Sequence, residues 1–495
     1  MLFNSIHFLI FFPVVAGLYF VIPRKLKAAF LLLASYFFYM CWNPKYIVLI
    51  LITTVVTYTV GLLMGKDMSD KKKKVLMGVG FFINFGLLFL FKYLDFSISI
   101  INKLLGPLHI SAISNPFDFL LPVGISFYTF QAIGYCIDIY RGDVKPEKNF
   151  IKYALFVSFF PQLVAGPIER SKNLLSQIDE MGKKKTLWNR DSIVSGFTMM
   201  MYGLFMKMVI ADRVAIFVDK IYGNLYLVGT AEMLLAAFGF SIQIYADFAG
   251  YSAIAIGAAR FMGIDLMENF NTPYFAASIA DFWRRWHVSL STWFRDYVYI
   301  PLGGNRKGTV RKYINLMITF LVSGLWHGAS LSFVAWGGIH GIYQVVGDVT
   351  KPIKERACKA LGVKKDVFSY KLGQIICTFL LTTFAWIFFR AGSIGVALTY
   401  IKRMFTRWNP WAFFDESLYT WGLDRVESLI LFVALLVIFA ISVVRYKTGD
   451  DIGKALLKQN LWFRWVVLIF FMVAIVVYGE YGITFSSNKF IYFDF

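Results

Sequence analysis

Long apolar runs separated by short, mostly basic loops dominate the pattern of hydrophobic and polar positions along this chain of 495 residues. A helix that spans a bilayer needs about 20 mostly apolar residues. The pattern predicts about ten full crossings, at residues 5–22, 26–42, 46–65, 75–101, 117–140, 192–218, 231–257, 373–389, 427–444 and 461–478. We therefore expect an all-α polytopic integral membrane protein, with residues 1–495 in a single membrane domain.

Two further apolar stretches predict elements that enter the bilayer without crossing it. The stretch 153–168 is short for a crossing, contains two prolines and has basic loops on both sides. This combination predicts a re-entrant element. Residues 313–347 form two apolar arms that meet near Trp326, His327 and Gly328. A broken backbone of this kind is tolerated at membrane depth only where protein or water covers it.

Residues 278–297 predict one amphipathic helix that lies at the membrane surface. Ser278, followed three residues later by Asp281, has the spacing of a capping box at a helix start. At about 100° per residue, the aromatic side chains share one broad face. His287 falls at the edge of this face, beside a stripe that contains Arg295, and such an arrangement suits an interfacial helix.

Composition and charge support a membrane protein and restrict its topology. The chain is 58% hydrophobic and 16% charged, which is too apolar for a soluble globular protein. Its net charge of +20 comes from basic loops, the pattern that fixes topology in membranes. With these loops in the cytoplasm, the N-terminus and residues 490–495 are expected outside it. The four cysteines form no CxxC pair and predict neither a disulfide framework nor a zinc cluster.

His327 places a group that titrates near neutral pH in the middle of apolar sequence. Ionisable residues at membrane depth are rare and mark functional sites. The residues around it, Ser323, Gly324, Gly328 and Ala329, are small. They are expected to leave room for the backbone or chain of another molecule.

A deep histidine suits the transfer of an acyl group from a thioester to an alcohol. An alcohol is a poor nucleophile at neutral pH, so a base must take its proton as it attacks. We identify His327 as the candidate base and His287 as a second histidine that orients or assists. Arg284, Arg285 and Arg295 are candidates for holding the phosphates of an anionic donor such as acetyl-CoA, and phospholipid headgroups are the alternative ligands.

Other residues are expected to line a tunnel or support the site: Trp326, Asp281, Ser323, Asp247 and His340. The alternative for Asp247 is a structural charge paired near Lys207 and Asp212, and the alternative for His340 is packing. A structural hydrogen bond is the alternative for His287. No metal site is predicted, because the histidines lack HExxH spacing and nearby carboxylates. No permanently bound cofactor is expected either.

Several motifs resemble the membrane-bound O-acyltransferase (MBOAT) family. The most specific are DFWRRWHVSLSTWFRDYVYIPLGGNR at 281–306, GLWHGAS at 324–330 and WGGIHG at 336–341. Further motifs are similar to the branch of alginate O-acetyltransferase membrane subunits. They are the initial MLFNS, LPVGISFYTFQAIGY (121–135), QLVAGPIER (162–170), YADFAGYS (245–252) and the final FIYFDF. The resemblance spans nearly the whole chain, with departures at Ala253, Leu331, Ser332 and Asp494 that remove no presumed catalytic group.

The resemblance implies a function and partners. In the family, His327 matches the catalytic histidine and His287 the second characteristic histidine, in a fold whose central tunnel joins a cytoplasmic thioester to an outer acceptor. Members of this branch pass acetyl groups to extracytoplasmic SGNH-type acetyltransferases. The implied partners are therefore acetyl-CoA, such an enzyme, the machinery of an exported polysaccharide and membrane lipids, with no nucleic acid. The implied location is the bacterial inner membrane.

Three alternatives stay open at this stage. The first is transfer of D-alanine, or another acyl group, to teichoic acid from a carrier-protein thioester. The second is a polysaccharide transporter without chemistry of its own, because broken helices with buried charges also occur in transporters. The third concerns residues 490–495, which are expected to dock the partner enzyme or to act as an aromatic anchor at the interface.

Overall fold

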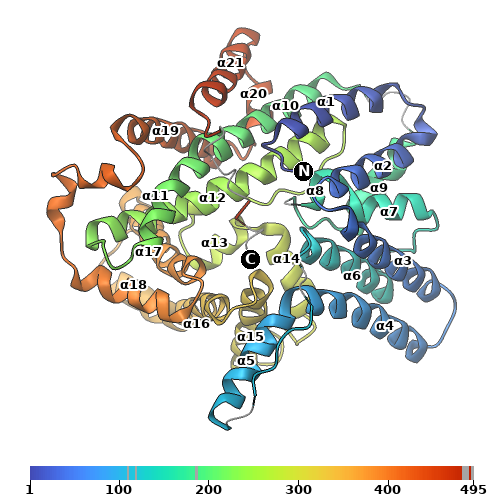
Figure 1. Ribbon diagram of the computed structural model, residues 1–495, viewed down its shortest axis with the longest axis horizontal. Helices are drawn as coiled ribbons and strands as arrows, with labels where there is room; N and C mark the ends of the chain where they lie inside the picture. The colour runs from blue at the N-terminus through green and yellow to red at the C-terminus, as the bar shows by residue number, and fades with distance from the viewer. Residues whose placement is uncertain (109–110, 118–119, 165, 184–187, 482–489, 492–495) are drawn as a thin grey trace. The chain divides into compact units, whose positions relative to one another are not determined.

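A computed structural model describes residues 1–108, 111–117, 120–164, 166–183, 188–481, 490 and 491. Within these ranges the regular secondary structure is helical, and no strand is present, which confirms the predicted all-α membrane fold (Figure 1). In the described part of the chain, seven helical stretches are long and apolar enough to cross a membrane, and they correspond to seven of the ten predicted crossings. The other three form helices of 14 to 17 residues, α1, α2 and α6.

The packing divides the chain into two compact units. A single domain over residues 1–495 stays a prediction, and so does the central tunnel. Unit 1 holds Met1–Phe197 and Ala255–Met267, and unit 2 holds Thr198–Ile254 and Glu268–Phe495. Two helices, α10 (Arg190–Leu204) and α12 (Thr230–Phe261), contribute residues to both.

Unit 1 is built mainly from the helices of the first 181 residues. They are α1 (Ile6–Val21), α2 (Lys27–Met40), α3 (Ile47–Met64), α4 (Asp70–Leu88), α5 (Leu94–Leu105), α6 (Ile125–Arg141), α7 (Phe150–Ser158), α8 (Phe160–Leu163) and α9 (Ser171–Met181). Helix α6 packs against α3 and α4, and α7 packs against α2. Helix α6 begins later than predicted, because Gly124 adopts a left-handed conformation with φ of 77°.

The predicted re-entrant element at 153–168 contains a broken helix, formed by α7 and α8. The break falls at Phe159, just before Pro161. The carbonyl of Phe156 accepts hydrogen bonds from the Nε2 atoms of Gln131 and Gln162, at 2.6 and 2.9 Å. These two amides satisfy a carbonyl at the interrupted turn, which a buried break requires. Entry and exit on the same side of the membrane stay a prediction.

Glu169 is a buried carboxyl in the loop between α8 and α9 of unit 1. Its oxygens accept hydrogen bonds from the backbone N–H of Met267 and from Nδ2 of Asn173. Burial raises the pKa of the Glu169 carboxyl to about 7, although the two hydrogen bonds by themselves lower this pKa. The folded protein therefore holds a proton on Glu169 at pH values where an unfolded chain has released it.

The stability of the wild-type protein is expected to fall as the pH rises from about 4.5 to about 7, by up to about 3 kcal/mol from Glu169 alone. The sign follows because the folded state binds more protons than the unfolded state in this window. Glu169→Gln should flatten the slope, measured as the thermal midpoint in detergent at pH 5 to 8. Asp179→Asn is the control, since Lys152 lowers the pKa of Asp179 below this window. An unchanged slope in Glu169→Gln would contradict the prediction.

Unit 2 contains the remaining helices. They are α11 (Asp212–Gly223), α13 (Ile279–Arg285), α14 (Val288–Phe294), α15 (Thr309–His327), α16 (Leu331–Ala360), α17 (Phe368–Arg390), α18 (Ile394–Thr406), α19 (Arg425–Thr448), α20 (Ile452–Leu457) and α21 (Leu461–Tyr478). A π-helical segment, Phe205–Ala211, joins α10 to α11. Helix α18 was not predicted because it is short and amphipathic, with Lys402 and Arg403 on its polar side.

Candidate functional site

A tight helical hairpin in unit 2 positions His327. Helices α15 and α16 pack along each other (Figure 1), and the chain between them turns at residues 328–330. His327 is the last residue of α15 and is only 2% exposed. The predicted meeting of two apolar arms at this point is therefore confirmed.

Small residues permit the close approach of the two arms. A Cβ atom on Gly324 would lie 2.3 Å from the carbonyl oxygen of Phe333, and one on Gly337 would lie 2.3 Å from that of Phe320. At Gly328 an added Cβ would meet the Phe333 ring at 2.2 Å. The prediction that Gly324 and Gly328 leave room for another molecule is wrong, because α16 itself fills that space.

Gly337→Ala is expected to destabilise the hairpin by at least about 1 to 3 kcal/mol, because its methyl group would collide with backbone atoms that cannot move aside. Gly338→Ala is the matched control on the same helix. A Cβ at Gly338 lies 3.5 Å from the nearest atom, on Leu321, which is an ordinary contact. It is expected to be neutral or to stabilise by up to about 1 kcal/mol through helix propensity. Equal thermal midpoints for both variants would refute this account.

The region around His287 differs from the single interfacial helix predicted at 278–297. Two short helices, α13 and α14, are separated at Trp286 and His287. His287 adopts a left-handed backbone conformation with φ of 43° and is fully buried. Histidine tolerates this conformation better than most residues. The prediction of a surface helix with His287 at its edge is thus wrong, because the break turns the side chain inward.

Neighbouring hydrogen bonds stabilise this unusual backbone. The N–H of Val288 donates to the carbonyl oxygen of Asn269 at 3.0 Å. The hydroxyl of Ser289 donates to Oδ1 of Asn269 at 2.6 Å. Strained conformations persist only where the surroundings over-determine them, and they cluster at functional sites. Asn269 and Ser289 are therefore part of what holds His287 in place.

His287 and His327 lie next to each other. Their ring centroids are 6.3 Å apart, and the planes meet at 60°. Trp326 contacts both rings, at 5.0 Å from His327 and 6.1 Å from His287. Phe248 of α12 packs edge-on against His287 at 4.7 Å. The two histidines predicted from the sequence thus form one buried aromatic cluster with Trp326.

The predicted capping box and the three arginines have more local roles. The N–H of Asp281 donates to Oγ of Ser278 at 3.1 Å, as predicted, while Oδ2 of Asp281 accepts from Ala277 at 3.2 Å. Arg285 forms an ion pair with Asp281 at 3.0 Å. The other two arginines, Arg284 and Arg295, are exposed, and Arg295 pairs with its neighbour Asp296. Donor binding by these arginines stays a prediction.

Asp247 belongs to a buried group of charges. Lys207 lies 2.8 Å from Oδ1 of Asp212 and 2.8 Å from Oδ1 of Asp247. The other oxygen of Asp247 accepts the backbone N–H of Ile491 at 2.7 Å. Phe490 is fully buried and packs on Phe248 at 5.6 Å. Asp247 therefore holds Ile491, and with it Phe490, beside the histidine cluster. Residues 492–495 of the predicted docking segment lie outside the described residues.

His340 lies on α16 behind the cluster, and Ser323 is buried on α15. Nδ1 of His340 accepts a hydrogen bond from the indole N–H of Trp283 at 3.2 Å. Trp336 lies between the two histidines of the hairpin, with ring centroids 5.0 Å from His327 and 5.1 Å from His340. His340 thus supports the site through Trp336 and does not join His287 and His327 directly.

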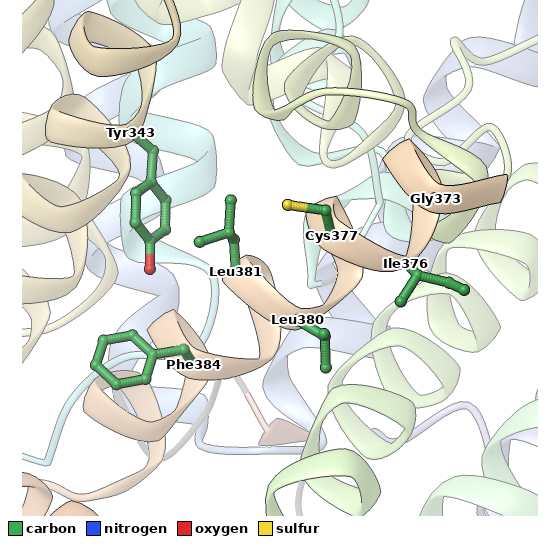
Figure 2. Close-up of a pocket in the computed structure, with 7 residues that line it drawn as sticks. All are labelled: Tyr343, Gly373, Ile376, Cys377, Leu380, Leu381 and Phe384. Atoms are coloured by element: carbon green, nitrogen blue, oxygen red, sulfur yellow. The ribbon is translucent and has the colours of Figure 1, made fainter. Parts of the chain in front are cut away.

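A hollow of about 560 Å3 lies between α16 and α17 (Figure 2). Its lining is mostly apolar, with Tyr343 from α16 and Cys377 and Phe384 among the residues from α17. The Tyr343 ring also packs against His340, at 5.9 Å. Among the described residues, no group of three or more His, Cys, Asp or Glu side chains is arranged to hold a metal ion.

Sequence reasoning missed several residues of the site. Phe248 and Phe389 come from helices distant in sequence, and Asn269 and Ser289 support the break in an irregular segment. No periodic pattern marks such neighbours. The motifs were the available signal: 245–252 contains Phe248, 281–306 contains Ser289 and 336–341 contains Trp336, but none of these residues was given a role.

Comparisons with known proteins support one family. Residues 147–389 match the sequence model described as MBOAT, membrane-bound O-acyltransferase family. The chain is 36% identical over 460 residues to a probable alginate O-acetylase of Pseudomonas syringae pv. tomato, covering 92% of this chain and 85% of that protein. It is 36% identical over 434 residues to a peptidoglycan O-acetyltransferase of Helicobacter pylori, covering 82% and 80%. It is 30% identical over 243 residues to a teichoic acid D-alanyltransferase of Bacillus subtilis, covering 46% and 59%.

Proposed function

Because the chain belongs to the membrane-bound O-acyltransferase family and is an O-acyltransferase, we propose that it transfers acetyl groups from cytoplasmic acetyl-CoA for the O-acetylation of an exported polysaccharide. The relatives named as alginate and peptidoglycan O-acetyltransferases support acetyl as the group and a polysaccharide as the final acceptor. His327 is the proposed general base. The proposed location is the bacterial inner membrane, with both termini outside the cytoplasm.

The single observation that carries the proposal is the pairing of two buried histidines at the broken ends of helices. His327 ends α15, and His287 sits in the break between α13 and α14, with ring centroids 6.3 Å apart. A site this buried excludes bulk water, which protects a thioester from hydrolysis. The proposal therefore requires that substrates reach His327 along a path inside the protein.

In the proposed reaction, a hydroxyl oxygen of the acceptor attacks the thioester carbonyl carbon while His327 takes the hydroxyl proton. The carbonyl electron pair moves to oxygen, and a C–O bond forms. When the carbonyl re-forms, the C–S bond breaks and the thiolate of coenzyme A receives the proton from His327. His287 orients His327 or the donor, and the arginines Arg284, Arg285 and Arg295 attract the donor's phosphates.

A second candidate is the transfer of D-alanine to teichoic acid. The similarity to the Bacillus subtilis D-alanyltransferase favours it. That similarity covers 46% of this chain, however, while the O-acetyltransferase relatives cover 82 to 92%. A transporter without chemistry of its own is not supported as a third candidate, because the family is described as O-acyltransferases and the relatives that cover most of the chain are named as O-acetylating enzymes.

Purified protein is expected to release free thiol from acetyl-CoA when an extracytoplasmic SGNH-type acetyltransferase or a polysaccharide acceptor is present. A deletion strain should lose acetate esters from its surface polymers and retain D-alanine esters. Loss of D-alanine with acetate unchanged would support the second candidate instead. No thiol release with any acceptor, together with unchanged acetate, would refute the proposal.

A further inference from the structure

Four buried N–H donors lie in one aromatic cluster around His327. The indole N–H groups of Trp286, Trp336 and Trp386 are fully buried and have no hydrogen-bond partner among the described residues. The same holds for Nε2 of His340, whose Nδ1 accepts from Trp283. Because a neutral imidazole carries one proton, this hydrogen bond places it on Nε2. All four groups are therefore donors.

The four donors form a continuous group. The rings of Trp336 and Trp386 stack at 5.4 Å with an angle of 20°, and Trp286 packs on Trp386 at 5.0 Å. His340 contacts Trp336 at 5.1 Å. Phe282 and Phe389, which also pack in this region, bring no acceptor. Tyr274 packs on Trp286 and Tyr343 on His340, but neither hydroxyl accepts a hydrogen bond from these donors.

Leaving a donor buried and unpaired costs about 1 to 3 kcal/mol, so each such group calls for an explanation. Four neighbouring donors without an acceptor suit a ligand that brings oxygen atoms and no donors of its own. The carbonyl oxygen of an acyl thioester is such an atom. It becomes an oxyanion when an alcohol attacks, and donors placed in advance stabilise that charge.

Of these four donors, Trp336 is the one whose ring contacts His327. The two ring centroids lie 5.0 Å apart, at an angle of 88°. Gly337, the next residue, packs against the Phe320 carbonyl and so fixes this turn of α16 against α15. The Trp386 ring contacts Trp336, Trp286 and Phe389 but has no ring contact with His327.

We propose that the indole N–H of Trp336 donates a hydrogen bond to the oxygen of the acyl carbonyl bound beside His327, and stabilises the oxyanion of the tetrahedral intermediate. This inference rests on the proposed function. In the step, the acceptor oxygen bonds to the carbonyl carbon and its proton passes to His327. The carbonyl π electrons become a lone pair on the carbonyl oxygen, which accepts the hydrogen bond from Trp336. Collapse of the intermediate returns that pair to the carbonyl and expels the thiolate, which takes the proton.

The test compares Trp336→Phe with Trp386→Phe in full-length protein in detergent, by acceptor-dependent thiol release from acetyl-CoA. Both variants keep an aromatic ring and lose one unpaired buried indole N–H. Loss of one oxyanion donor is expected to lower kcat about 10² to 10³-fold for Trp336→Phe. KM for acetyl-CoA should change by less than about threefold, because the donor acts in the transition state. The loss of kcat in Trp386→Phe should be at least about tenfold smaller than in Trp336→Phe, because the Trp386 ring contacts Trp336 and Phe389 but not His327.

The inference is overturned if Trp336→Phe keeps wild-type kcat, or if both variants lose kcat equally. If Trp336→Phe misfolds, replacing Trp336 with benzothienylalanine, in which sulfur stands for the N–H, retains the ring shape. The same loss of kcat is then expected, and full activity would overturn the inference. Wild-type protein that releases no thiol with any acceptor would instead refute the proposed function, so the two failures are distinguishable.

Discussion

Replacing His327 with glutamine is expected to abolish acyl transfer while leaving the protein folded in the membrane. Glutamine is polar and of similar size, but its amide cannot take up a proton near neutral pH and return it, as an imidazole does. General-base catalysis contributes about 10² to 10⁴-fold to a rate. We expect at least that loss in kcat for thiol release, and no acetate esters above background on the cell surface.

Two companion variants make this prediction specific. His287→Gln should lower kcat less than His327→Gln, because His287 is proposed to orient and not to take the proton. His7→Gln should behave as wild type, since His7 is exposed on α1. Equal amounts of each variant in membrane fractions and equal thermal midpoints would show that folding is preserved. Polymer acetylation near the wild-type level in His327→Gln would disprove the role of His327.

The fold and part of the site could be predicted because they depend on local patterns. Apolar runs of membrane length located the long helices, and the same signal placed His327 at the turn of the 313–347 hairpin. The hairpin could be seen because glycines interrupt an otherwise apolar stretch near a polar residue. Helix lengths were less predictable: α6 starts only at Ile125, where a left-handed glycine precedes it.

The surroundings of the site could not be predicted, because tertiary contacts override the local pattern. The stretch from Ser278 to Tyr297 has good helical periodicity, yet the chain breaks at His287, where Asn269 supplies hydrogen bonds that an uninterrupted helix would not need. Periodicity cannot report a partner 20 residues away, as Asn269 is from Ser289. In the same way, no spacing links Asp247 to Ile491, although one hydrogen bond joins them.

A second large effect is expected at Lys207, which holds two buried carboxylates together. Its ammonium group lies 2.8 Å from both Asp212 and Asp247, and the three side chains are at most 4% exposed. The trio connects the π-helical segment Phe205–Ala211, the start of α11 and the middle of α12. Through Asp247 it also holds Ile491, next to Phe490 and the histidine cluster.

Lys207→Met should destabilise the protein by about 3 to 5 kcal/mol, because removing the cation leaves two carboxylates buried without compensation. Asp247→Asn should cost less, since Lys207 and Asp212 then form a balanced pair and the asparagine oxygen can still accept the N–H of Ile491. The free energy of unfolding, measured by titration with sodium dodecyl sulfate in detergent micelles, gives the order. Lys183→Met, which removes an exposed cation beside Asp179, should stay within about 0.5 kcal/mol.

Adding Asp212→Asn and Asp247→Asn to Lys207→Met should recover part of the lost stability, because the triple variant buries no net charge. The recovery separates an electrostatic cause from a packing defect, which the added substitutions would not relieve. Activity should follow folding in this series, since the trio acts by fixing Phe490 and α12 beside His287. In His327→Gln, by contrast, activity should fall while stability holds. A Lys207→Met protein as stable as the Lys183→Met control would show that the buried carboxylates need no cation.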